Sequence, residues 1–185
     1  MAKADEERMN VFVLNTGRCG STTFVQACRH ISNYSAGHES NIHCVGVERL
    51  AYPSCHIEVD NRLSWLLGRL DREYGNRAYY VHLHRDREST ARSFEKRTNY
   101  GIMKAYREGI LLGGLEQHSP YVTALDYIDT VENNIALFLK DKSNKMNFRL
   151  EHVDTDFPRF WRNIGAKGDL EAALLEWKTS HNASV

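Results

Sequence analysis

The sequence lacks a surplus of charge of either sign, because 24 lysine and arginine residues balance 24 aspartate and glutamate residues. No overall field therefore draws the chain onto a nucleic acid or an anionic membrane, and we expect neither as a partner. Residues 1–8 lack the apolar core of a signal peptide, and no later run approaches the ~18 apolar residues of a membrane span. We therefore expect a cytoplasmic protein whose anion-binding site, if it has one, is local.

The sequence also lacks any Cys-x-x-Cys pair. Its four cysteines are Cys19, Cys28, Cys44 and Cys55. We expect them to be reduced structural thiols. The pairs at residues 43–44 and 55–56 offer zinc-ligand chemistry, but adjacent ligands rarely point at one ion and the spacing matches no zinc module. We therefore predict no metal site.

Short apolar runs alternate along the chain with segments of helical periodicity. We predict strands at residues 9–15, 56–60, 78–84 and 147–151, and helices at residues 22–28, 62–74, 86–97, 121–140, 156–164 and 169–177. Residues 33–55 are expected to be mostly loop, and residues 101–114 a glycine-bearing connection. This alternation indicates an α/β fold, a three-layer sandwich with a central, mainly parallel sheet flanked by helices. Its length favours a single domain, 1–185.

The turn between the first predicted strand and helix contains Gly17, Arg18, Cys19, Gly20, Ser21, Thr22 and Thr23. Such a turn presents unpaired backbone amides and the positive end of the helix dipole to an anion, and Arg18 adds a fixed charge. It therefore predicts a phosphate or sulfate site, although a tight turn into a helix also uses glycine and hydroxyl residues without a ligand. A standard ATP or GTP loop is disfavoured, because no lysine follows the second glycine.

The run Arg18-Cys19-Gly20-Ser21-Thr22 resembles the phosphosulfate-binding loop of the sulfotransferases that use 3′-phosphoadenosine 5′-phosphosulfate (PAPS). A second element resembles the part of that family that grips the donor's 3′-phosphate. Here Arg85 and Asp86 end a strand, and Ser93 stands eight positions after Arg85. Eight residues into a helix make about two turns, so Ser93 can point back toward Arg85.

This resemblance implies a P-loop NTPase-like sulfotransferase fold and an enzyme that moves a sulfuryl group from PAPS to a hydroxyl or amine. It implies that 3′,5′-ADP is the product, that Arg18 stabilises the departing phosphate, and that no metal takes part. The acceptor is expected to be a small molecule, a carbohydrate or a peptide. Its pocket is expected to come from residues 36–56, from Asp60 and Arg62, and from residues 100–114. The segment 181–184 is expected to fray rather than close over the donor.

Two adjacent residues are candidates for the general base. Glu39 lies 21 residues after Arg18, which resembles the position of a catalytic glutamate in the protein-tyrosine and some carbohydrate branches of the family. His38 is chemically as suitable, and the sequence leaves the choice open. The helix at 121–140 is expected to serve packing, and Arg92, Lys96 and Arg97 are expected to form a solvated charged face.

Two other functions fit the same turn. A small-molecule kinase with a degenerate phosphate loop would need magnesium-binding carboxylates such as Asp60 or Asp86 near Ser21. A non-catalytic nucleotide-binding protein would keep the pocket and dispense with the base.

Overall fold

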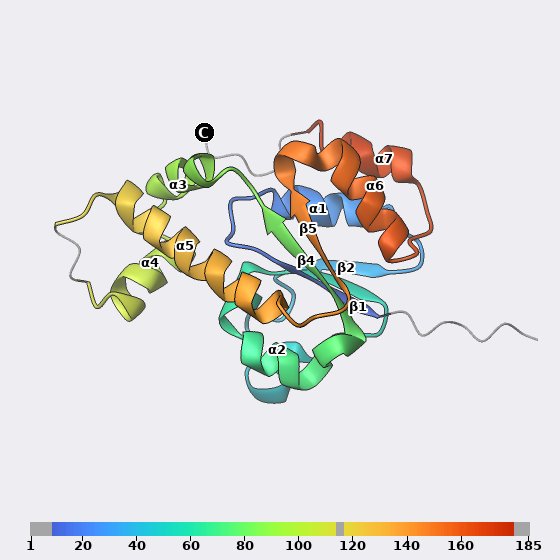
Figure 1. The fold of residues 1–185 in the computed structure, drawn as a ribbon, viewed down its shortest axis with the longest axis horizontal. Helices are drawn as coiled ribbons and strands as arrows, with labels where there is room; N and C mark the ends of the chain where they lie inside the picture. Colours follow the sequence, from blue (N-terminus) through green and yellow to red (C-terminus); the bar gives the residue numbers. More distant parts are fainter. Residues whose placement is uncertain (1–8, 114–116, 180–185) are drawn as a thin grey trace, which may run out of the picture.

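The computed structural model describes residues 9–113 and 117–179, which build a five-stranded sheet between layers of helices (Figure 1). The strands lie in the order β2-β3-β1-β4-β5, and every neighbouring pair is parallel. Their bounds are β1 Asn10–Leu14, β2 Ser35–His38, β3 His56–Val59, β4 Ala78–His84 and β5 Lys145–Arg149. The predicted α/β sandwich with a parallel sheet is confirmed. The predictions for residues 1–8 and 181–184 fall outside the described residues.

The longer helices divide between the two faces of the sheet (Figure 1). One face is covered by α1 Ser21–Cys28, α6 Val153–Asn163 and α7 Leu170–Glu176. The other is covered by α2 Leu67–Tyr74, α3 Arg87–Glu95, α4 Gly101–Ala105 and α5 Pro120–Leu139. Short 3₁₀ turns occupy Gly46–Leu50, Asn61–Trp65, Gly75–Arg77 and Leu150–His152, and a π-helical turn occupies Tyr106–Ile110. In the described part of the chain, no helix is long and apolar enough to cross a membrane.

The central strand β1 is apolar on both faces because helices cover both faces. Val11 and Val13 pack into the cluster beneath α1, α6 and α7, while Phe12 and Leu14 pack into the cluster beneath α2 and α5. All four side chains are fully buried, and each such burial is worth about 1.5–3 kcal/mol. Alternate residues of a strand point to opposite faces, so this run of apolar residues fixes β1 between two cores.

Two segments that the sequence indicated as loop contain regular structure. Residues 33–55 include β2 and a 3₁₀ turn, and residues 101–110 form α4 with its π-helical turn. The prediction missed β2 because its residues, Ser-Ala-Gly-His, are small or polar and carry little strand preference. Backbone pairing with β3, with Ser35 opposite His56, makes the strand. The last strand also lies two residues earlier than predicted, because Leu150–His152 turns as 3₁₀ helix.

Candidate anion-binding site

The carboxyl ends of β1, β2, β3 and β4 reach one edge of the sheet, because these strands are parallel. The turns that follow them border a cleft of about 710 Å³. One charged residue from each turn lines it: Arg18 after β1, Glu39 after β2, Arg62 after β3 and Arg85 after β4. The topology of the sheet therefore brings together residues that are far apart in the sequence.

The turn after β1 has an unusual backbone. Gly17, Arg18 and Gly20 have φ angles of 87°, 59° and 87°. A positive φ costs a non-glycine residue on the order of 1–3 kcal/mol, so Arg18 is held in a strained conformation. A Cβ on Gly17 would come within 2.9 Å of the Asn61 amide nitrogen, and one on Gly20 would come within 2.9 Å of Leu150. Glycine is therefore required at both positions for conformation and for space.

Helix α1 begins at this turn with its first amides directed at the cleft. Gly20 caps the helix without a side-chain hydrogen bond, and the first intrahelical bond runs from the Phe24 amide to the Gly20 carbonyl at 2.9 Å. The amides of Ser21, Thr22 and Thr23 precede that bond, and all three residues line the cleft. A helix start of this kind offers unpaired amides to an anion, so the geometry is compatible with the site that the sequence predicts.

Arg18 connects the two elements that the sequence singled out. Its Nε donates a hydrogen bond to the Ser93 hydroxyl at 2.9 Å, and its carbonyl accepts one from the Arg85 guanidinium at 3.0 Å. Burial lowers the pKa of Arg18, and the nearby charges of Arg97 and Arg85 lower it further. Arg97 and Arg85 thus lie close enough to repel Arg18, and a bound anion would relieve that repulsion.

The lining of the cleft carries a surplus of positive charge. Five described lining residues are cations: Arg18, Arg62, Arg85, Arg97 and Lys178. Among the described residues, Glu39 is the one carboxylate in the wall. Because the chain as a whole is neutral, this concentration of arginine is local and suits a ligand with several negative charges.

Arg97 corrects one expectation from the sequence. It was predicted to lie on a solvated face with Arg92 and Lys96, but it lines the cleft and acts on the charge of Arg18. Arg92 is exposed and lies 5.4 Å from the centre of the Tyr121 ring. Charge periodicity alone does not separate these residues, because Arg97 lies just beyond α3, where the chain turns back over the cleft.

Cys19 does not contribute its side chain to the cleft. The thiol is fully buried and donates to the Asn15 side-chain oxygen at 3.4 Å. Burial raises the pKa of Cys19 to about 12, which keeps it protonated and unreactive. Of the turn residues, Cys19 therefore serves the core, and only its backbone belongs to the anion-binding turn.

The two candidate bases lie together at the carboxyl end of β2. The Glu39 carboxylate forms an ion pair with Arg62 at 2.7 Å, and His38 Nε2 lies 3.3 Å from the Ser21 hydroxyl. Both residues line the cleft. Glu39 has a φ of 54°, so it is the second strained non-glycine residue in the wall. The sheet, and not the local sequence, places both residues at the cleft with Arg18. Strand β2 pairs in parallel with β3, and β3 pairs in parallel with β1.

The turn that holds Glu39 depends on a buried carboxylate. Glu58, on β3, is fully buried and accepts hydrogen bonds from the Ser40 amide at 2.8 Å, the Ser40 hydroxyl at 2.7 Å and His56 at 3.0 Å. Burial opposes the charge of Glu58, but the bonds from His56 and Ser40 outweigh burial and lower its pKa. Gly37 makes room, since a Cβ there would lie 2.1 Å from the Ser40 hydroxyl.

The expected acceptor region is only partly in the cleft. Tyr100 lines it, and so does Arg62, but Asp60 is fully buried and pairs with Arg49 at 2.5 Å. Residues that the sequence did not single out complete the wall. They are Asn61, Phe94, Leu150, Val153 and Trp177. The four apolar residues of this set are expected in the core when only the sequence is known, so their place in the cleft follows only from the fold.

Two solved structures share this fold. The sulfotransferase domain from the curacin biosynthetic pathway matches with a TM-score of 0.65 over 94% of this chain and 79% of that domain, at 14% identity. Mouse sulfotransferase SULT7A1, solved in complex with PAP, matches with a TM-score of 0.57 over 91% of this chain, at 12% identity. This chain spans 62% of the length of the mouse protein. No family model and no curated protein matches the sequence.

These matches define the class of fold. Both neighbours are sulfotransferases, and the cleft lies at the carboxyl ends of the parallel strands, where ligands of open α/β sheets bind. The protein therefore has the sulfotransferase fold, as the resemblance implied.

Proposed function

We propose that the protein is a sulfotransferase that takes PAPS as donor and passes its sulfuryl group to a hydroxyl or amine. The hydrogen bond between Arg18 and Ser93, with Arg85 on the Arg18 carbonyl, carries this proposal. It joins the turn that resembles a phosphosulfate loop to the element that resembles a 3′-phosphate grip. A donor that carries both groups accounts for both elements in one cleft.

The cleft suits PAPS through its charge. The amides of Ser21, Thr22 and Thr23 would hold the 5′-phosphate. Arg85, which lines the cleft, would hold the 3′-phosphate together with Ser93, which is not in the lining but bonds Arg18. Mouse SULT7A1, which shares the fold, was solved with PAP, and PAP is 3′,5′-ADP. That ligand supports a 3′-phosphorylated nucleotide as the occupant of the equivalent cleft in this protein.

The reaction needs positioning and charge more than covalent chemistry. The acceptor oxygen or nitrogen attacks sulfur, the bond from sulfur to the 5′-phosphate oxygen breaks, and 3′,5′-ADP leaves. Arg18 stabilises the negative charge that develops on the departing phosphate. The pKa of Arg18 is lowered from its usual value, but a guanidinium stays charged at neutral pH, so the charge is present for this step.

We assign Glu39 as the base that takes the acceptor's proton. The ion pair with Arg62 holds the Glu39 carboxylate at the wall of the cleft, where it can accept a proton from a bound acceptor. His38 is the rival, because it lies beside the Ser21 hydroxyl in the same wall. Comparison of Glu39→Gln with His38→Gln decides between them: the variant of the base loses transfer, and the other retains most of it.

A kinase is less well supported by the same wall. Magnesium-dependent phosphoryl transfer uses carboxylates beside the phosphates, but Asp60 is committed to Arg49 and Asp86 caps α3 through the Ser89 amide at 2.8 Å. Neither lines the cleft, and Glu39 is paired with Arg62. The expected kinase carboxylates therefore lie elsewhere in the described structure.

Thermal unfolding with three ligands tests the proposal. We expect PAPS and 3′,5′-ADP to raise the unfolding temperature without magnesium, and ATP with magnesium to raise it little. Stabilisation by ATP with magnesium alone would contradict the donor assignment. A protein that binds 3′,5′-ADP but passes no sulfuryl group to any tested phenol, sugar or peptide hydroxyl would instead be the non-catalytic nucleotide-binding protein.

The acceptor side of the cleft is open to more than one class. Tyr100 and Ile102 also line the cleft, and the Tyr100 side chain is exposed. An aromatic and an aliphatic residue suit the face of a phenol, a sugar ring or a tyrosine side chain. The acceptor can therefore be a small molecule, a carbohydrate or a peptide. Transfer assays with one member of each class distinguish these three.

A further inference from the structure

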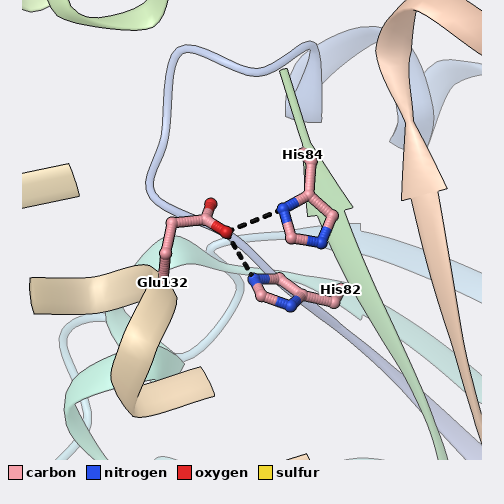
Figure 2. Close-up of side chains that lie close together, drawn as sticks. All are labelled: His82, His84 and Glu132. Atoms are coloured by element: carbon pink, nitrogen blue, oxygen red, sulfur yellow. Dashed lines mark ion pairs between the residues drawn. The ribbon is translucent and has the colours of Figure 1, made fainter. Parts of the chain in front are cut away.

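Two histidines on β4 and a glutamate on α5 point at one another behind the turn after β4. His82 and His84 are two residues apart and therefore project from the same face of the strand. Figure 2 shows that both imidazoles approach the same oxygen of Glu132, at 3.1 Å from His82 Nε2 and 2.7 Å from His84 Nδ1. One nitrogen or oxygen from each residue lies within 4.8 Å of the others.

The buried histidine of this cluster, His82, has an unsatisfied ring nitrogen. His82 is 3% exposed, and its Nε2 lies near the Glu132 carboxylate without the alignment that a hydrogen bond requires. An unsatisfied buried polar atom costs about 1–3 kcal/mol, so such atoms call for a specific reason. Two imidazoles and a carboxylate that meet at one place, with a buried ring nitrogen left unsatisfied, offer the donor set of a metal site.

The spacing fits a small cation. Zinc binds histidine nitrogen and carboxylate oxygen at about 2.0–2.2 Å, which puts tetrahedral ligand atoms about 3.3–3.5 Å apart. The Glu132 oxygen lies 3.1 Å from His82 Nε2 and 2.7 Å from His84 Nδ1, so shifts of less than about 1 Å would make room for an ion between these atoms. The two imidazole rings are tilted by 41° with their centres 3.7 Å apart, which is compatible with that small opening.

The donor atoms are of the kinds that zinc binds, two imidazole nitrogens and one carboxylate oxygen.

A second cavity gives an ion access. It has a volume of about 570 Å³ and borders the cluster through His84 and Glu132. Asp129, Glu151 and His152 stand around the same cavity, so further oxygen and nitrogen atoms and water can reach an ion on that side. Arg85 lies at the wall of both this cavity and the anion-binding cleft.

We propose that His82, His84 and Glu132 form a site for a divalent transition-metal ion, of which Zn²⁺ is the expected occupant. Three protein ligands leave a fourth position toward the cavity, the arrangement of exchangeable rather than closed zinc sites. From the sequence we predicted no metal site, and we expected the helix at residues 121–140, which contains Glu132, to serve packing only. His-x-His on a strand carries no specific signal until the fold brings Glu132 to it.

Metal titration tests this site independently of any nucleotide. Protein freed of metal with a chelator is titrated with Zn²⁺ by calorimetry, and bound metal is counted after dialysis. We expect about one Zn²⁺ per chain in the wild type and close to none in Glu132→Gln or His84→Ala. Co²⁺ in place of Zn²⁺ should give the intense visible absorption of a four-coordinate site, and Glu132→Gln should abolish it.

Two controls make the result decisive. His30→Gln breaks a different histidine–glutamate pair, His30 with Glu176 at 3.0 Å, and should keep the bound zinc. Glu132→Gln is nearly isosteric, and circular dichroism verifies that it is folded. Wild-type protein that binds no Zn²⁺, or variants that bind it like the wild type, would overturn the site and show an ion-pair cluster only. Neither result bears on 3′,5′-ADP binding, which tests the anion-binding cleft separately.

Discussion

The turns after β1 and β2 border the same cleft, but they are held in place by different means. The turn after β1 takes its shape mainly from its own residues. Gly17 and Gly20 have positive φ angles, and the Gly17 amide donates a hydrogen bond to the side-chain oxygen of Asn15. The turn after β2 takes its shape from a neighbouring strand, because Glu58 fixes Ser40 through two hydrogen bonds. The backbone of the first turn follows largely from its own glycines, although Arg85 and Ser93 also bond Arg18, whereas the second turn depends on a residue of another strand.

This difference separates binding from stability. Substitutions in the turn after β1 should act mainly on the ligand, since its backbone carries the amides and its side chain carries the charge. Substitutions that support the turn after β2 should act on folding and, through it, on the position of Glu39. The four variants below test that division in order of expected effect.

Arg18→Ala should have the largest effect. Removal of the charge at the departing phosphate is expected to slow sulfuryl transfer by about 10²–10³-fold, the typical loss for one transition-state donor. Release of 3′,5′-ADP from PAPS, with water as the acceptor, measures the rate without knowledge of the natural acceptor. Arg29→Ala, at the far end of α1, should leave the rate unchanged. A wild-type rate in Arg18→Ala would remove Arg18 from the mechanism.

Glu58→Gln should destabilise the fold by about 2–3 kcal/mol, because the neutral amide cannot replace a carboxylate that accepts three hydrogen bonds. The pKa of Glu58 is lowered in the folded protein from its usual value of 4.5. Its charge therefore stabilises the fold above pH 4.5, and this contribution is lost as the pH falls through the lower folded value.

Urea unfolding at pH 7 and at pH 3 measures this effect. The gap between wild type and Glu58→Gln should be widest at neutral pH and should shrink in acid. Exposed Glu73→Gln serves as the control and should track the wild type at both pH values. A gap of constant size across the pH range would show that shape, not charge, is what Glu58 supplies.

Ser93→Ala should weaken 3′,5′-ADP binding by about 1–3 kcal/mol through loss of one charge-assisted hydrogen bond and of the restraint on Arg18. Calorimetric titration measures the change, and thermal unfolding without ligand should be nearly unaltered. Ser54→Ala, an exposed serine outside the cleft, should bind like the wild type. If Ser93→Ala also binds like the wild type, the serine contributes nothing to the donor site.

Gly37→Ala should have the smallest effect of the four, about 1–2 kcal/mol of lost stability from overpacking. Its added methyl group meets the Ser40 hydroxyl and the Glu58 carboxylate, while the backbone conformation itself suits alanine. Gly68→Ala in α2 is the matched control, because a Cβ there meets nothing and helix preference favours alanine. Equal stability of the two variants would argue against the close approach at Gly37.

The same contrast explains what the sequence could predict. The β1 strand, the turn at residues 17–23 and the Arg85–Ser93 spacing are local patterns, so they indicated the parallel sheet and the residues that meet at Arg18. Strand β2 has no such pattern, because Ser35–His38 becomes a strand only by pairing with β3. Arg97, Glu58 and the His82–Glu132 cluster likewise gain their roles from contacts between residues far apart in the chain.

Recognition of the 3′-phosphate is the most direct test of the proposed donor. Calorimetric titration of the wild type with 3′,5′-ADP and with AMP, which differ only in that phosphate, compares the two affinities at one salt concentration. We expect 3′,5′-ADP to bind at least about tenfold more tightly, since charge-assisted bonds from Arg85 contribute about 1.5–3 kcal/mol, and Arg85→Ala to erase the difference. Equal affinity for the two nucleotides in the wild type would contradict a PAPS site in this cleft.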